Sequence, residues 1–193
     1  MTKAIILKSV AILIGIALAA TAAAEPAPGA ETPARLRLFG QNGIGVMFYR
    51  NSTCYKTGFL GPYGGESVSG GLVDAFSSFI GKANNTVIGM PETVNTKMQN
   101  EKDGLLSKAY YKEYTVKPDE ILTIFTALGD ASGFHCGPIA FSFTPKAGAD
   151  YEGFLEVNWK EKICRFNLNE IVKSDQSTDL VSVNTAYRSS RCE

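Results

Sequence analysis

The chain has 193 residues, of which 45% are hydrophobic and 20% are charged, and its 19 basic residues balance 19 acidic ones. A balanced charge gives no long-range attraction towards nucleic acid or anionic lipid, so the composition argues against functions that depend on a basic patch. The hydrophobic content is sufficient for a folded core.

The first 24 residues have the three parts of a signal peptide. Lys3 and Lys8 form a basic start, residues 10–20 (VAILIGIALAA) are apolar, and three alanines at 22–24 offer a small-residue cleavage site. A membrane-spanning helix needs roughly 20 apolar residues, whereas Lys8 shortens this run to about 15. We therefore predict cleavage after Ala24, export to the periplasm or the medium, and no stable membrane insertion of the mature chain. Removal of the two lysines leaves 17 basic and 19 acidic residues, a net charge of −2.

Residues 25–33 (EPAPGAETP) predict a flexible leader, because a mixture of proline, alanine, glycine and acids cannot bury a core. Folding is expected to begin at Ala34. The remaining residues, 34–193, are a suitable length for one domain with its own hydrophobic core.

Alternation of apolar with other residues predicts two strands directly after the leader. Leu36 and Leu38 alternate with arginines, and residues 44–49 (IGVMFY) continue the two-residue period. Between them, residues 40–43 (GQNG) contain an Asn-Gly pair, which readily adopts the positive φ angles of a tight turn. The pattern predicts a β-hairpin.

The middle of the chain has weaker signals. Residues 58–81 are rich in glycine and serine, and within them the apolar stretch 72–80 predicts either a short helix or a loop with an apolar anchor. Residues 85–90 (NTVIGM) predict a short strand that Pro91 ends. The polar residues 92–104 show no periodicity and predict an exposed loop.

Strand patterns return in the C-terminal half. They predict strands over residues 108–116, 121–128, 138–144, 151–157, 164–168 and 180–187. Residues 121–128 (ILTIFTAL) are apolar on both faces, which is typical of a central strand, whereas residues 138–144 predict Ile139, Phe141 and Phe143 inward and Ala140, Ser142 and Thr144 outward. About eight strands without alternating helices predict an antiparallel β-sandwich, immunoglobulin-like or transthyretin-like, with one short helix or long loop.

Three stretches resemble small exported β-sandwich proteins of unknown function from Gram-negative bacteria. They are residues 34–39 (ARLRLF), 88–91 (IGMP) and 143–152 (FTPKAGADYE), the last followed by Cys164. The resemblance implies the same fold and compartment. It carries over no active residue.

The four cysteines fall in the mature chain, and an even number in an exported protein predicts two disulfides. Sequence alone permits three pairings, and we favour Cys54–Cys136 with Cys164–Cys192, because the second would fasten the C-terminal segment to the body of the fold. Zinc binding is disfavoured because no two cysteines lie closer than 28 positions.

No residue pattern predicts catalysis. The one histidine, His135, precedes Cys136, but adjacent strand residues point to opposite faces, and a disulfide explains the cysteine better than a Cys-His pair. Two carboxylates across a cleft could hydrolyse glycosides, although sequence cannot show which acids converge. The candidate acids are Asp74, Glu113, Asp150, Glu152 and Glu156. For Glu152 and Glu156, a solvated position on an outer strand face is the simpler expectation.

The tyrosines of residues 108–116 offer a candidate binding face, because exposed aromatic rings can stack on sugars or dock a protein. These residues are Tyr110, Tyr111 and Tyr114. We therefore expect a protein without cofactor or metal that binds another envelope protein or a glycan. A carboxylate-dependent hydrolase and a structural or surface-assembly subunit are the alternatives.

Overall fold

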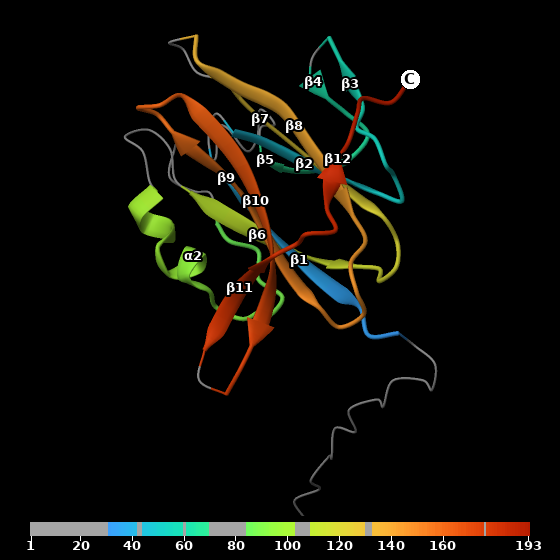
Figure 1. The fold of residues 1–193 in the computed structure, drawn as a ribbon, viewed down its shortest axis with the longest axis vertical. Helices are drawn as coiled ribbons and strands as arrows, with labels where there is room; N and C mark the ends of the chain where they lie inside the picture. Colours follow the sequence, from blue (N-terminus) through green and yellow to red (C-terminus); the bar gives the residue numbers. More distant parts are fainter. Residues whose placement is uncertain are drawn as a thin grey trace, which may run out of the picture. The chain divides into compact units, whose positions relative to one another are not determined.

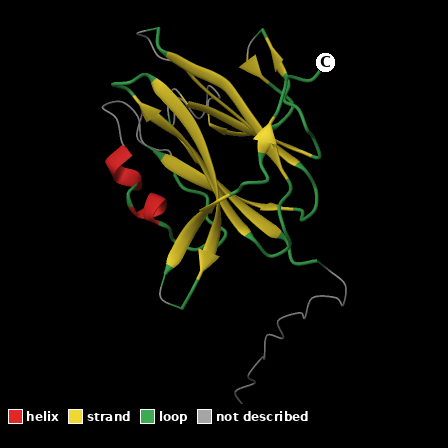
Figure 2. Cartoon of the chain, in the orientation of Figure 1, coloured by secondary structure: helices red, strands yellow, loops and turns green. Residues whose placement is uncertain are grey.

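The computed structural model describes residues 31–41, 44–59, 61–69, 84–102, 109–129, 133–175 and 177–193. The predicted signal peptide, the leader up to residue 30, the apolar stretch 72–80 and Asp74 lie outside these residues. Within them, no helix is long and apolar enough to cross a membrane. Strands make up most of the regular structure, as Figure 2 shows.

Two five-stranded sheets form the body of the described domain (Figure 1). The first sheet has the order β11 (Thr178–Ser182), β10 (Ile163–Lys173), β9 (Asp150–Asn158), β1 (Ala34–Gly40) and β6 (Tyr110–Val116). The second sheet has the order β12 (Tyr187–Arg188), β8 (His135–Phe143), β7 (Leu122–Gly129), β2 (Ile44–Arg50) and β5 (Glu66–Ser69). A small ribbon pairs β3 (Thr57–Gly58) with β4 (Gly61–Pro62). The predicted β-sandwich class is confirmed.

The core lies between the two sheets because each contributes one apolar face. Leu36 and Leu38 of β1 and Phe48 of β2 are fully buried in one cluster with residues of β6 to β9. Aromatic pairs join the sheets across this core: the rings of Phe48 and Tyr114 lie 4.8 Å apart. The predicted central strand is confirmed, since β7 lies between β8 and β2 and is buried almost throughout.

The predicted hairpin of the first two strands is wrong. β1 pairs antiparallel with β6 and parallel with β9, whereas β2 pairs with β5 and β7 in the other sheet. Between β1 and β2 the chain crosses from one layer to the other, and only a bridge from Gln41 to Ile44 connects them. A turn signal such as Asn-Gly fixes a change of direction, but the burial of both apolar faces decides which sheet each strand joins.

The predicted exposed loop over residues 92–104 is also wrong where the structure describes it. It contains the short helices α2 (Val94–Lys97) and η1 (Gln99–Lys102), and Thr93 caps α2 in a capping box with Thr96. Thr93 and Gln99 are buried. The strand predicted at 85–90 is reduced to a single bridge between Thr86 and Lys112.

A second apolar cluster covers the outer face of the second sheet. Ala140 packs there with Tyr49, Tyr55 and Phe125, and the Ser142 hydroxyl is fully buried beside that of Thr123 at 2.6 Å. Ala140 and Ser142 therefore point outward as predicted, but this outer face is covered and both residues are buried. The outer face is covered because the C-terminal segment returns across it and hydrogen-bonds to Tyr55.

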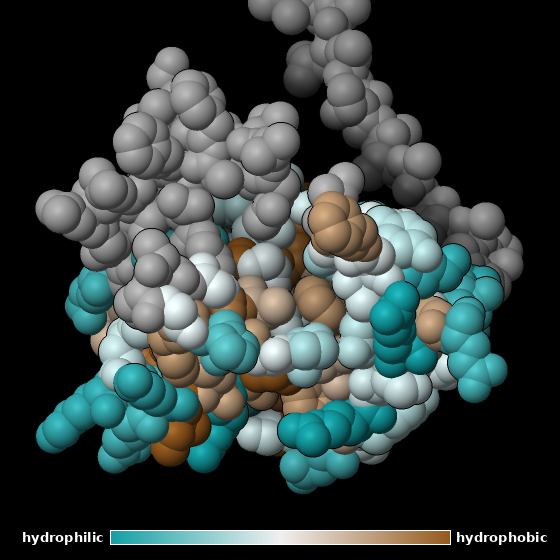
Figure 3. Space-filling view, turned by 90° about the horizontal axis from the view of Figure 1, so that it is seen from above, coloured by the Kyte–Doolittle hydropathy of each residue, from teal (hydrophilic) through white to brown (hydrophobic). Residues whose placement is uncertain are grey.

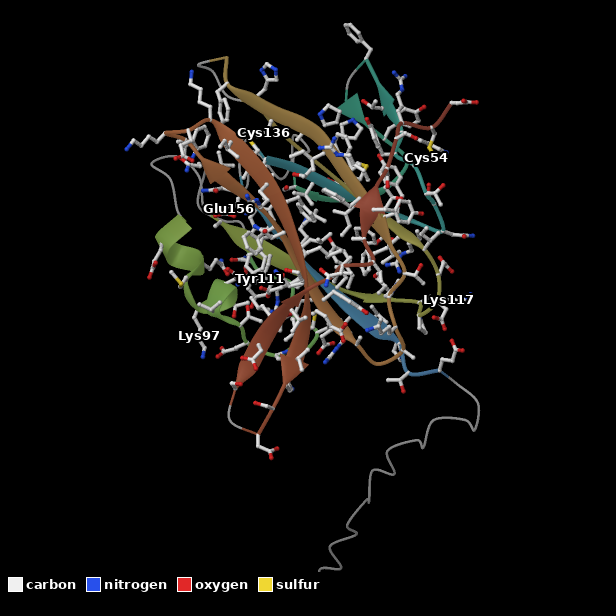
Figure 4. The ribbon with its side chains drawn as sticks, in the orientation of Figure 1. Cys54, Lys97, Tyr111, Lys117, Cys136 and Glu156 are labelled. Carbon is white, nitrogen blue, oxygen red and sulfur yellow. A yellow bond between two sulfur atoms is a disulfide. The ribbon has the colours of Figure 1, made fainter. Side chains whose placement is uncertain are left out.

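Two disulfides are present, as predicted, but the favoured pairing is wrong. Cys54 joins Cys192 and Cys136 joins Cys164, with Cα–Cα distances of 5.1 and 5.9 Å. The C-terminal segment is fastened as expected, but to the loop after β2, where the backbones of Tyr55 and Cys192 are hydrogen-bonded (2.9 Å). Figure 4 shows Cys54 near the C-terminal end and Cys136 where β8 passes β10. Two disulfides are characteristic of an oxidising compartment.

Candidate functional site

A buried charged cluster lies on the outer face of the first sheet. The strand register places Arg37 of β1 directly opposite Glu113 of β6 on one side and Glu152 of β9 on the other. The Arg37 guanidinium donates to Glu113 at 2.7 and 3.0 Å and to Glu152 at 3.2 Å. All three side chains are at most 1% exposed. The prediction of a solvated Glu152 is wrong, because residues 88–95 cover this face of the sheet.

The covering segment is held down by this same cluster. The backbone N–H groups of Ile88 and Met90 donate to Glu113, and the Pro91 carbonyl accepts from Arg37 at 2.8 Å. Thr93 and Asn95 donate to Glu152 at 2.8 and 2.6 Å. Backbone and side-chain donors of the protein therefore hydrogen-bond both oxygens of each carboxylate.

Glu113 is held in its charged form. Burial by itself would raise the pKa of its carboxyl, but the hydrogen bonds from Ile88, Arg37 and Met90 together bring the pKa below its ordinary value. A general acid for glycoside hydrolysis needs the opposite shift and must reach the substrate. Glu113 and Glu152 do converge, but both are enclosed and both are paired with the one guanidinium of Arg37.

The other acids and the histidine that the sequence nominated lie apart. Asp150 receives two hydrogen bonds of 2.6 Å from Arg35, whose pKa is raised chiefly by this interaction. Glu156 is exposed and accepts from Asn167. His135 is exposed, and Cys136 beside it is oxidised in a disulfide. Among the described residues, no group of three or more histidines, cysteines or acids is placed so that it could bind a metal ion.

The predicted tyrosine face is divided by the pleat of β6. Tyr110 and Tyr114 point towards the core, where Tyr110 is buried and donates to the Val68 carbonyl at 3.1 Å. Tyr111 lies on the opposite face, half-buried, with its ring 5.5 Å from that of Phe39 and 5.1 Å from the Arg37 guanidinium carbon. The three rings therefore do not share one exposed surface.

An aromatic surface does exist at one end of the sandwich. Trp159, in the turn between β9 and β10, is 56% exposed, and its ring lies 5.4 Å from that of Phe134, which precedes β8. Ile163 at the start of β10 is 52% exposed. We call these three residues the tip platform. Large apolar side chains that are exposed as a group often mark surfaces where another molecule binds.

The tip platform is built on a rigid base. The Cys136–Cys164 disulfide joins the starts of β8 and β10, and hence the two sheets, within two residues of Phe134 and one residue of Ile163. Asn158 closes the turn that carries Trp159: its side chain accepts from the Glu161 N–H at 3.0 Å and donates to the Glu161 carboxylate at 2.9 Å. Trp159 is thereby presented in a defined position with little entropy left to lose on binding.

Two exposed lysines and an exposed histidine are chain neighbours of the tip platform. Lys160, Lys162 and His135 are all exposed and adjoin Trp159, Ile163 and Phe134 in the chain. Figure 3 views the domain from above, the end that carries the tips of β8 to β10. In this view hydrophilic and apolar residues lie next to each other. An apolar centre with a polar surround is the usual composition of a protein-binding patch.

A polar cleft lies elsewhere, between α2 and the turn that joins β10 to β11. It has a volume of about 520 Å³ and hydroxyl groups dominate its lining. The lining residues are Glu92, Thr93, Val94, Lys97, Ser174, Ser177 and Thr178. Two of these hydroxyls, on Ser174 and Ser177, bond to each other at 2.9 Å, so the cleft has neutral donors and acceptors together with one acid and one amine.

Sequence reasoning missed the tip platform and the buried cluster. Trp159 is the one tryptophan of the chain, in the polar sequence NWKEK, and a large aromatic residue in a polar turn is the signal that could have revealed it. The position of Arg37 between Leu36 and Leu38 predicts a solvent-exposed side chain, because polar residues that alternate with apolar ones normally lie on the outer face of a strand. In the structure Arg37 is buried.

No protein-family model, curated protein or solved structure matches this chain. The functional argument therefore rests on the molecule's own geometry.

Proposed function

We propose that the protein is an exported, non-catalytic cell-envelope protein that binds another envelope protein through the tip platform. The observation that carries the proposal is the exposure of Trp159 beside Phe134 on a turn braced by the Cys136–Cys164 disulfide. Export is supported by the signal-peptide pattern of residues 1–24 and by the two disulfides.

The ion pairing and burial of the candidate acids favour a binding role over catalysis. Of the acids that the sequence nominated and the structure describes, Glu113 and Glu152 share one buried arginine, and Asp150 pairs with Arg35. A hydrolase would need one carboxyl that can hold a proton near the scissile bond and a second that faces it across an open groove. The paired and covered acids favour a structural role in holding down residues 88–95.

A protein partner fits the tip platform better than a polar ligand does. Tryptophan is enriched among the few residues that dominate the free energy of protein interfaces. Ile163 adds an exposed apolar side chain on the strand that follows the turn, and Lys160 and Lys162 of the same turn can meet acidic residues of the partner.

The test compares three forms of the disulfide-bonded protein in capture from an envelope fraction: wild type, Trp159→Ala and Val181→Ala. Val181 is 51% exposed on β11 and serves as a matched apolar control outside the tip platform. We expect one partner to be retained by wild type and Val181→Ala and to be lost, by at least tenfold, with Trp159→Ala. The purified partner should then change the fluorescence of Trp159 on titration. Equal retention by all three forms would refute the proposal.

Glycan binding at the hydroxyl-lined cleft is the second candidate, because that cleft has many neutral hydrogen-bonding groups. A glycan panel with wild type, Lys97→Ala and Ser177→Ala tests it separately. Binding that the cleft variants weaken and Trp159→Ala leaves unchanged would support the cleft and not the tip platform. A surface-assembly role, the third class, predicts self-association of the purified protein on size-exclusion chromatography.

A further inference from the structure

An apolar pocket lies between the two sheets, where the chain passes from one to the other. After β11 ends at Ser182, residues 183–186 cross over to the second sheet, which the chain rejoins at Tyr187 in β12 (Figure 1). A backbone hydrogen bond of 3.0 Å from Val183 to the Leu168 carbonyl holds the start of the crossing against β10, and one of 3.2 Å from Ala186 to the Val183 carbonyl closes a turn within the crossing. The crossing is therefore a defined wall of the pocket.

The pocket lies where the crossing contributes short side chains next to the short strand β12. β12 pairs with β8 at only two positions, Tyr187 with Ser142 and Arg188 with Phe141. The Phe141 and Phe166 rings, one from each sheet, are nearly parallel at 21° with centroids 6.4 Å apart. At the crossing, Ala186 has no side chain beyond Cβ to fill the remaining space.

The resulting pocket has a volume of about 190 Å³. Its lining residues are Phe141, Phe166, Asn167, Leu168, Asn169, Ser182, Val183 and Ala186. Five of them are apolar, three have neutral polar side chains, and none is ionisable. The pocket opens to solvent: Leu168 is buried, Ser182 is exposed, and the other lining residues are partly exposed. An apolar group that enters it gains dispersion contacts with the ring and aliphatic atoms of its wall.

The volume and lining define a ligand class. An apolar cavity of about 150 Å³ accepts one benzene molecule, so this pocket can hold a ring or chain of about six to eight carbon atoms. A charged head group would be disfavoured, because no lining residue carries a charge to pair with it. Asn167, Asn169 and Ser182 can instead serve a hydroxyl or an amide.

We propose that this inter-sheet pocket binds the apolar end of a small, uncharged amphiphile with an alkyl or aryl group of about six to eight carbons. The site is independent of the tip platform. Neither Trp159 nor Phe134 lines it.

The test uses 1-hexanol as the probe and Ala186→Leu as the variant that fills the pocket. Titration is followed by NMR chemical shifts of the backbone amides of Leu168, Val183 and Ala186. We expect saturable shifts for wild type and at least tenfold weaker binding for Ala186→Leu, with an unchanged or raised midpoint of thermal unfolding because the added side chain fills a void. Thr185→Leu, which adds the same side chain at an exposed neighbouring position, should bind like wild type.

Three further measurements on the probe keep the proposal falsifiable even if Ala186→Leu folds poorly. Along the series from 1-butanol to 1-decanol, affinity for wild type should rise and then level off near eight carbons, and hexanoate should bind more weakly than hexanol at neutral pH. Trp159→Ala should bind hexanol as wild type does, which separates this site from the proposed function. Unsaturable shifts, affinity that rises steadily through decanol, or equal binding by a folded Ala186→Leu would overturn the proposal.

Discussion

Arg37 and Glu113 form a two-point ion pair that is shielded from solvent: the Nε and Nη2 atoms of the arginine both donate to Oε1 of the glutamate, at 3.0 and 2.7 Å. The pair occupies directly opposed positions on β1 and β6. It connects the outer face of the first sheet to the segment that covers it, because Glu113 also accepts from the backbone of Ile88 and Met90.

Replacement of Arg37 by alanine should destabilise the protein strongly. Two carboxylates would lose their buried counter-charge, and removal of one partner of a buried ion pair typically costs about 3–5 kcal/mol. Urea unfolding followed by circular dichroism measures the loss. Lys146→Ala breaks the exposed pair with Glu170 (3.2 Å) and should leave the midpoint almost unchanged. Similar midpoints for both variants would contradict a central role for Arg37.

The charged cluster should also make stability depend on acid pH. The folded-state pKa of Glu113 lies below its ordinary value, so its contribution is fully present above the ordinary value of about 4.3 and is lost as pH falls through the folded-state pKa. Free energies of unfolding measured from pH 6 down to pH 2 should fall less steeply for Glu113→Gln than for wild type. Parallel curves for the two proteins would show that Glu113 does not contribute this dependence.

Loss of either disulfide should lower stability, but by different amounts and with different effects on partner binding. In the chain-entropy account, removal of Cys54–Cys192, which spans 138 positions, costs more stability than removal of Cys136–Cys164, which spans 28, and both costs fall within about 2–5 kcal/mol. Thermal unfolding of the two double alanine variants tests the order. Only loss of Cys136–Cys164 should weaken partner binding, because only that disulfide braces the tip platform. Peptide mapping under non-reducing conditions verifies the pairing directly.

Trp159 should report its exposure by fluorescence. Because it is the one tryptophan and is 56% exposed, native emission should resemble that of a solvated indole and acrylamide should quench it efficiently. Trp159→Ala should change the free energy of unfolding by less than about 0.5 kcal/mol, as expected for a surface side chain. A blue-shifted, protected emission or a large loss of stability would indicate that the indole belongs to the core.

Sequence periodicity predicted much of the fold. The alternation in the C-terminal half located β6 to β10, and the apolar run at 121–128 correctly predicted a strand with neighbours on both sides. The number of cysteines predicted two disulfides. These features are local or compositional, so they can be read from neighbouring residues without knowledge of which segments meet.

The candidate site could not be predicted in the same way. Tyr110, Tyr111 and Tyr114 are aromatic and close in sequence, but the pleat of β6 divides them between two faces. The tip platform instead combines Phe134 and Trp159, which adjoin strands of different sheets. Their proximity depends on how the sheets pack, and no local pattern encodes it.

The sequence by itself determined the strand-rich class, the main strand positions and the presence of cross-links, because these follow from side-chain alternation and composition. Only the tertiary structure decided that β1 and β2 lie in different sheets, that Cys54 reaches Cys192, and that Arg37 gathers Glu113 and Glu152 beneath residues 88–95. The first outcome separates strands that are neighbours in the chain, and the other two join residues that are distant in it. The physical reason is that burial depends on how the layers pack. From the sequence, a polar strand face is predicted to be solvent-exposed, and only the packed structure shows that another segment covers it.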